Sequence, residues 1–323
     1  MAYVTGTAAS FANLLTALRN ACTANGWTLS GDVLHKGDCY VETKVAAIRS
    51  GAPATGHLIV RAGNGIDGAN ALTDPAPRSM GMGLLNAVSG GANYPDWDWP
   101  VTYHVHIHGD EVHMFANYDA GQRWQFVAFG RSPAPGCVGT GNWCTATMVD
   151  AGSYSQARIN SYSIQPEGAH TDSSIGGGYF WGVRIKKASA IHGAHDATTG
   201  LARWSNPDAH FSSSLVDGQC SAAPTQSPLL SYLPNAWNSE TILLPIQIVN
   251  LRPESKVSLI GELQHARVTR NDFIVPGGVI TLGPDKWKVY PFYKKDTTQR
   301  DGVGSSGTDH SGTMAVAIRY DGP

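Results

Sequence analysis

Alternation of apolar and polar side chains is the feature of this 323-residue chain that most restricts its fold. It is clearest in 101–108, and two further strand-like segments follow at 112–116, after Gly109-Asp110, and at 123–130. A period of two residues places successive side chains on opposite faces of a β-strand, and Gly-Asp favours a tight turn between strands. The sequence therefore predicts an antiparallel meander of three strands in the middle of the chain.

Short apolar runs elsewhere extend the β pattern. Glycine is abundant, at 37 residues, and glutamate is scarce, which disfavours helices. The run that contains Pro245 is expected to form an edge strand or a bent strand, because proline has no backbone N–H to donate. We expect a mainly β fold, built from sandwich-like or barrel-like sheets. The additional predicted strands are 57–61, 178–185, 242–249, 257–263, 279–282, 287–292 and 313–320.

One amphipathic helix is expected near the N-terminus. Ser10 can cap its start, and Asn25-Gly26 can end it because glycine tolerates a left-handed backbone. An extended segment should follow from Trp27. The apolar residues at helical spacing are Phe11, Leu14, Leu15, Leu18 and Cys22.

The chain is expected to divide into two domains. Residues 1–155 would form a domain of the N-terminal helix and the β-meander, and residues 156–323 a β-rich C-terminal domain. Around 186–240 the composition changes to Ser, Ala, Asn, Pro and His, with few β-branched runs. We expect a long irregular insertion there, which is our candidate for a docking or host-facing arm.

Composition excludes several classes of protein. Lys and Arg total 23 and Asp and Glu 25, so affinity for nucleic acid cannot rest on global basic charge. A hydrophobic content of 42% excludes a disordered polyelectrolyte. No run approaches the roughly 20 apolar residues of a membrane span, and the first residues lack the pattern of a signal peptide. We expect no nucleic-acid or membrane partner.

The five cysteines are an odd number in a long chain, which suits thiols in a reducing cytoplasm better than a disulfide framework. Cys137 and Cys144 lie seven residues apart in a glycine-rich stretch, where they can form a local pair.

The most conspicuous polar cluster is His104, His106 and His108. Strand periodicity places all three on one face, and His113 can lie opposite them on the return strand. Such a face can bind a metal within one chain or at an oligomer axis, although three ligands along one straight strand are awkward. The alternative is a polar strand face with hydrogen-bonded or solvated imidazoles. No other cofactor is indicated.

The segment Asp96-Trp97-Asp98-Trp99 has a second noteworthy composition. Aromatic faces stack on sugars, and paired carboxylates perform acid and base chemistry on glycosidic bonds. The flanking Pro95 and Pro100 instead favour a structured loop in which the two indoles are anchors.

Enzyme motifs are weak or missing, and we expect no catalytic activity. Residues 63–68 match G-x-G-x-x-G after a predicted strand, but the Asp74-Pro75-Ala76-Pro77 that follows cannot extend the helix that dinucleotide binding requires. The sequence contains neither a G-x-S-x-G elbow nor a phosphate-binding loop.

Several stretches taken together resemble virion structural proteins of tailed bacteriophages, of the tail and baseplate type. The resemblance covers most of the chain and thins between about 186 and 240. It implies a β-rich protein that self-associates symmetrically and docks to other virion proteins, with no catalytic residues. The stretches are 5–7, 11–18, 25–27, 104–106, 110–112, 117–119, 124–130, 139–143, 287–295, 310–313 and 316–321.

The resemblance implies a location in the virion after synthesis in the bacterial cytoplasm. We favour the tail tip or baseplate over the neck or collar, and both over head decoration. The alternatives are a receptor- or carbohydrate-binding tail module that contacts a host surface receptor, and a glycan depolymerase that uses Asp96 and Asp98 with Trp97 and Trp99.

Overall fold

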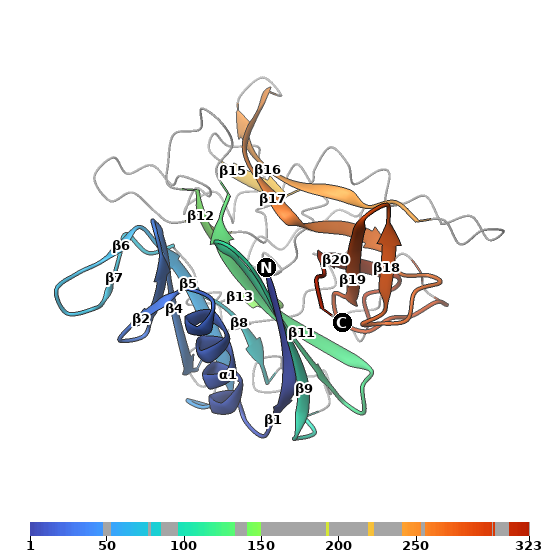
Figure 1. Cartoon of the computed structure of the whole chain (residues 1–323), viewed down its shortest axis with the longest axis horizontal. Helices are drawn as coiled ribbons and strands as arrows, with labels where there is room; N and C mark the ends of the chain where they lie inside the picture. The colour runs from blue at the N-terminus through green and yellow to red at the C-terminus, as the bar shows by residue number, and fades with distance from the viewer. Residues whose placement is uncertain are drawn as a thin grey trace, which may run out of the picture.

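The computed structural model describes most of the N-terminal half and of the C-terminal third of the chain (Figure 1). The part of the chain that it describes contains one α-helix, three antiparallel six-stranded sheets (A, B and D) and a two-stranded ribbon, sheet C. The predicted mainly β fold with one N-terminal helix is therefore confirmed. The described residues are 1–47, 53–76, 79–84, 96–132, 141–149, 192–193, 219–222, 241–252, 256–298, 300 and 310–322.

Helix α1 (Phe11–Ala24) forms where the apolar spacing predicted it. The Ser10 hydroxyl accepts a hydrogen bond from the Asn13 N–H at 3.2 Å, which satisfies one of the unpaired donors of the first turn. The helix ends at Ala24, Asn25 is its C-cap, and Gly26 follows with φ of 84°. No helix in the described part of the chain is long and apolar enough to cross a membrane.

Sheet A contains the predicted meander, which is confirmed. Residues opposite each other include His106 and His113 on β9 and β10, and Phe115 and Phe126 on β10 and β11. The edge strand β1 was not predicted. The strand order is β1 (Ala2–Ala8), β9 (Val101–His108), β10 (Glu111–Tyr118), β11 (Arg123–Arg131), β12 (Asn142–Ala146) and β14 (His192–Gly193).

Sheet B is formed mostly by residues 28–83 and includes the predicted strand at 57–61. Its order is β13 (Met148–Val149), β8 (Met80–Gly83), β5 (His57–Gly63), β4 (Cys39–Ala46), β3 (Val33–Lys36) and β2 (Thr28–Ser30). Sheet C pairs β6 (Gly65–Ile66) with β7 (Leu72–Thr73).

Sheet D contains the predicted C-terminal strands with bounds shifted by up to three residues, except that the strand predicted at 257–263 runs on to Arg270. The strand with Pro245 lies between two others rather than at an edge. Its pairing shifts register between Pro245 and Ile246, so the bent alternative is the correct one. The order is β15 (Gln219–Ala222), β16 (Leu244–Arg252), β17 (Lys256–Arg270), β20 (Met314–Arg319), β19 (Asp285–Pro291) and β18 (Val279–Leu282).

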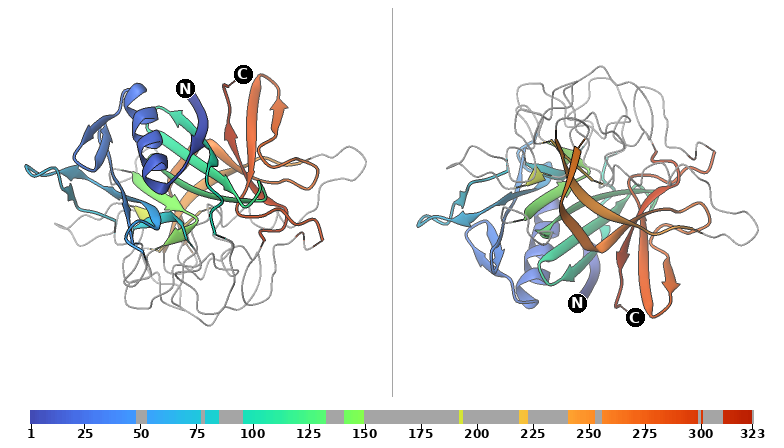
Figure 2. Two further views of the ribbon diagram at one scale, coloured as in Figure 1. Left: turned by 90° about the horizontal axis from the view of Figure 1, so that it is seen from below. Right: turned by 90° about the horizontal axis from the view of Figure 1, so that it is seen from above.

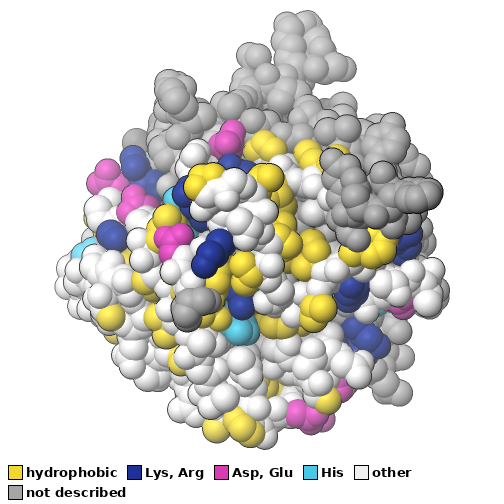
Figure 3. Space-filling model, turned by 45° about the vertical axis from the view of Figure 1, so that its right-hand side comes forward, with side chains coloured by type: hydrophobic (Ala, Val, Ile, Leu, Met, Phe, Trp, Pro, Cys, Tyr) yellow, Lys and Arg dark blue, Asp and Glu magenta, His cyan; other side chains and the backbone are white. Residues whose placement is uncertain are grey.

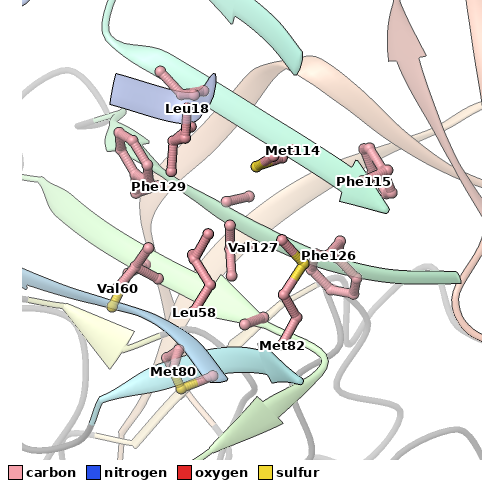
Figure 4. Close-up of a cluster of buried hydrophobic side chains, with 14 of the residues drawn as sticks. Leu18, Leu58, Val60, Met80, Met82, Met114, Phe115, Phe126, Val127 and Phe129 are labelled. Atoms are coloured by element: carbon pink, nitrogen blue, oxygen red, sulfur yellow. The ribbon is translucent and has the colours of Figure 1, made fainter. Parts of the chain in front are cut away.

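Sheet A is the middle layer of the molecule. Two further views place α1 on one side of it and the strands of sheet D on the other (Figure 2). Between sheet A and sheet B, Leu18 of α1, Leu58 of β5 and Val127 of β11 are buried in one cluster (Figure 4). Tyr290 of β19 belongs to the same cluster, so one continuous core joins the three sheets.

The expected domain boundary at 155/156 lies outside the described residues. The strand predicted at 178–185 also lies outside them. Of the insertion predicted around 186–240, the structure describes only the short strands β14 and β15.

Leu18→Ala should lower the free energy of unfolding by about 2–5 kcal/mol, because the side chain is fully buried among three elements and its loss leaves a cavity. Denaturant unfolding monitored by circular dichroism measures this change. Leu29→Ala, at a position 38% exposed on β2, is the matched control and should cost less than about 1 kcal/mol. Equal losses in the two variants would contradict this placement of the core.

Candidate functional site

The predicted histidine face exists on β9, where His104, His106 and His108 point to the side of sheet A that meets sheet D. The register with β10 places His113 opposite His106 and Glu111 opposite His108. Residues directly opposite on antiparallel strands share one face of the sheet. Five titratable side chains therefore lie together between two sheets.

Tyrosines from neighbouring strands bind two of these imidazoles. The Tyr3 hydroxyl lies 2.6 Å from His104 Nδ1, and the Tyr290 hydroxyl lies 2.8 Å from His106 Nε2. The Tyr290 ring also stacks on Phe115, with centroids 4.0 Å apart. We call this region the histidine–tyrosine interface, and its members are Tyr3, His104, His106, His108, His265, Tyr290 and Tyr320.

His108 is bound differently from the other two histidines. It is 5% exposed, and its ring stacks on His265 of β17 with centroids 4.5 Å apart and planes 18° apart. Neither of its ring nitrogens has a hydrogen-bond partner among the described residues, and His265 Nδ1 has none either. The contact between these two histidines is therefore a ring stack and not a hydrogen bond.

The nearby carboxylate of Glu111 is already engaged on both oxygens. Oε1 lies 2.7 Å from His113 Nε2, and Oε2 accepts a hydrogen bond from the Gln264 N–H at 3.2 Å. Glu111 is 3% exposed, so these two contacts satisfy an acidic group that water barely reaches.

Burial disfavours the charged form of the interface histidines. It lowers the pKa of His104 to about 4, with Lys288 adding to the effect. It lowers the pKa of His108 to about 2, with His113 and His265 adding next. Burial also lowers the pKa of His106 and of His265. These imidazoles are therefore neutral at pH 7.

The metal hypothesis for His104, His106 and His108 gains no support from their placement. Among the residues that the structure describes, no three His, Cys, Asp or Glu side chains are grouped to hold a metal ion. Tyrosine hydroxyls lie within hydrogen-bond distance of the first two histidines, and the third stacks on another imidazole. The contacts of His104 and His106 match the alternative of hydrogen-bonded imidazoles, and the metal site stays a prediction.

The segment 96–99 is a loop, and its first indole belongs to the core. Trp97 is buried, stacks on Tyr118 at 4.6 Å, and donates a hydrogen bond from Nε1 to the Gly83 carbonyl at 3.1 Å. Trp99 is half-buried with its ring against Phe11. Asp96 and Asp98 are exposed beside these anchors. The geometry favours the anchored loop over a sugar-stacking site, because Tyr118 covers a face of the Trp97 ring.

The glycine-rich stretch after β5 leads into sheet C and not into a helix, as expected for a loop without dinucleotide-binding geometry. The thiols of Cys22, Cys39 and Cys144 are buried. Burial raises the pKa of Cys22 and of Cys144 to about 12, which suppresses the reactive thiolate. Cys137 lies outside the described residues, and with it the predicted pair with Cys144.

A surface feature that sequence reasoning missed lies at the β18 end of sheet D. Val279 and Leu282 of β18 are exposed, as are Phe273 and Val275 in the preceding turn. Figure 3, with the sheet D side brought forward, shows hydrophobic side chains in several groups on that face. The apolar composition of both faces of the strand was the available signal. We call these four residues the β18 edge patch.

No family model matches the chain, and no curated protein is significantly similar to it.

Trp97→Ala should destabilise the protein by about 3–5 kcal/mol, since it removes a buried ring and its hydrogen bond. The double variant Asp96→Asn/Asp98→Asn should change stability by no more than about 0.5 kcal/mol, because both carboxylates are exposed. Thermal and denaturant unfolding test both. A glycan array run on the double variant and wild type would contradict the anchor interpretation if it found binding that the carboxylates control.

Tyr290→Phe should cost about 1–3 kcal/mol, because it keeps the ring on Phe115 but leaves buried His106 without its hydroxyl partner. Chemical denaturation at pH 7.5 measures the loss. Tyr103→Phe, on the opposite face of β9, is the control and should have a smaller effect. Equal stability of Tyr290→Phe and wild type would show that the hydrogen bond does not support the interface.

Proposed function

We propose that this chain is a structural component of a tailed phage particle, located at the tail tip or baseplate, which acts by associating with copies of itself and with other virion proteins. The resemblance spread over most of the sequence supports this role. The structural observation that carries the association mechanism is the β18 edge patch.

An edge strand presents unpaired backbone N–H and C=O groups, which makes it a template for another strand. Soluble proteins commonly protect such edges with charged residues or proline. Strand β18 (Val279–Leu282) carries neither, and it is the terminal strand of sheet D in the described part of the chain. Val279 and Leu282 are 43% and 62% exposed on opposite faces of it.

A second copy of this chain is the occupant that we assign to the edge. Two β18 strands can pair antiparallel about a two-fold axis, because each side then contributes the same residues and no charges meet within the strand. Phe273 and Val275 would add apolar area beside the paired strands. This contact would join two copies of sheet D into one longer sheet.

A closely packed core is compatible with a scaffolding role. The described tryptophans lie in the core or against it, as Trp124 and Trp143 do, and do not form exposed aromatic patches. Phe273 is the exposed exception among the described aromatic side chains.

The competing proposals are weaker on this geometry. A carbohydrate-binding module or depolymerase built on 96–99 would need free indole faces, and Trp97 is packed against Tyr118. Most of the predicted docking or host-facing arm around 186–240 lies outside the described residues, and its contact with a host receptor stays a prediction.

Immunogold labelling of purified particles from the source of this sequence tests the role. Gold at the tail tip or baseplate is the expected result. Gold at the neck, collar or head would keep the structural role and correct the position. Unlabelled particles, with the protein soluble in the lysate, would overturn the proposal.

Val279→Lys/Leu282→Lys should weaken self-association by about tenfold or more, because the paired strands would bring four like charges, two from each copy, close together. Analytical ultracentrifugation over a concentration series measures the constant. Leu29→Lys, on the edge strand β2 of sheet B, is the matched control and should leave association unchanged. Unchanged association in the double variant, or a monomeric wild type, would rule out the β18 contact.

A further inference from the structure

We propose that the histidine–tyrosine interface opens in acid. Proton uptake by His108 and His265 then separates sheet D from sheet A, while α1 and sheet B remain folded. This inference concerns the fold itself and stands whether or not the chain belongs to a virion. It rests on the stack that crosses between the two sheets and on the charges around it.

Protonation of the His108 ring would add an N–H group for which the described residues provide no hydrogen-bond acceptor. His108 is buried, and neither of its ring nitrogens has a partner among the described residues. A protonated imidazole has two N–H donors, and burying an unpaired charge costs far more than burying a neutral ring. Two protonated rings with centroids 4.5 Å apart would also repel each other directly.

The surrounding charges do not compensate. Arg319 of β20 and the N-terminal amino group act against a charge on His108, and Arg267 and Arg319 act against one on His265. Lys288 of β19 does the same at His104 and His106. The facing groups, strand by strand, are Met1 and Tyr3 (β1), His104 and His106 (β9), Glu111 and His113 (β10), Glu262 and Arg267 (β17), Asp285, Lys288 and Tyr290 (β19), and Arg319 and Tyr320 (β20 and its end).

Three carboxylates near these cations carry negative charge, and each already interacts with another group. Glu111 attracts a proton to His265, but its oxygens already bind His113 and the Gln264 N–H. Asp285 forms an ion pair with Arg319 at 2.6 Å. Glu262 favours the charged form of Arg267. An added proton therefore enters a region whose negative groups are engaged.

The other face of sheet A explains why opening would be local. Val105, Ile107 and Met114 point away from the histidines and pack in the core shared with α1 and sheet B. These side chains do not titrate. Acid therefore weakens one face of the sheet and leaves the hydrophobic contact on the other face intact.

The direction of the pH effect follows from the two states. Burial holds the pKa of His108 and of His265 below the ordinary value near 6.5, whereas a separated interface restores that value. The open form then binds more protons, so the closed form is fully favoured above about pH 6.5 and loses stability as the pH falls below it.

Hydrogen–deuterium pulse labelling of the full chain between pH 7.5 and 4 tests the proposal, after correction for intrinsic exchange rates. Peptides from β17, β19 and β20 should lose protection at a higher pH than peptides from β9, α1 and β5, and protection should return on neutralisation. Simultaneous loss in all of these peptides would indicate global acid unfolding and overturn the proposal.

His108→Phe/His265→Phe keeps two stackable rings but removes both titrating groups. It should move the opening transition down by about 0.5 pH unit or more. His35→Phe is the matched control, because His35 also stacks on an aromatic ring, Tyr40, but in sheet B; it should move nothing.

If the double variant does not fold, His265→Gln at the half-buried position replaces it and should lower the transition by a smaller step. An unshifted transition in the folded variants would overturn the proposal. A wild-type opening transition whose pH shifts when EDTA is present would also overturn the proposal, because metal release and not proton uptake would then control the opening of the interface.

Discussion

The covering of sheet A on both faces is the constraint on which the rest of the structure depends. A strand that is buried on one face alone can alternate apolar and charged residues. In sheet A the second face is also covered, so its side chains must be removed from water as well. Towards α1 and sheet B these side chains are apolar, as in Val105 and Ile107. Towards sheet D they include imidazoles and phenols beside Phe115, and polar atoms there find partners such as the Tyr290 hydroxyl for His106.

Local sequence patterns were sufficient for elements whose signals lie within a few residues. The helix followed from its apolar spacing and from Ser10, and the meander followed from alternation around Gly109. Strand β1 was not predicted, because small and polar residues such as Thr5 and Gly6 weaken its alternation of apolar and polar side chains. Residues 2–8 form a strand because they pair with β9, which lies almost a hundred residues later in the chain. The sequence of residues 2–8 alone does not indicate this pairing.

The candidate site shows the same limit. The shared face of the three histidines was predictable from a period of two, whereas their environment was not. His106 meets a tyrosine 184 residues away, and His108 meets His265 of another sheet. A metal site and a neutral interface have the same pattern along β9. Tertiary packing separates them, just as Tyr118 against Trp97 decides between an anchor and a sugar platform.

The two sides of sheet A differ in what holds them, and this matters for any assembly through sheet D. Aliphatic packing is insensitive to pH, while an interface of neutral imidazoles depends on keeping protons out. The β18 edge patch belongs to sheet D, so its position relative to α1 and sheet B is set through the histidine–tyrosine interface. A polar contact of this kind contributes less stability than an apolar one of equal area, but its directional bonds restrict how sheet D sits. Association through β18 and protonation of the histidines are therefore coupled wherever the arrangement of sheet D affects the contact between copies.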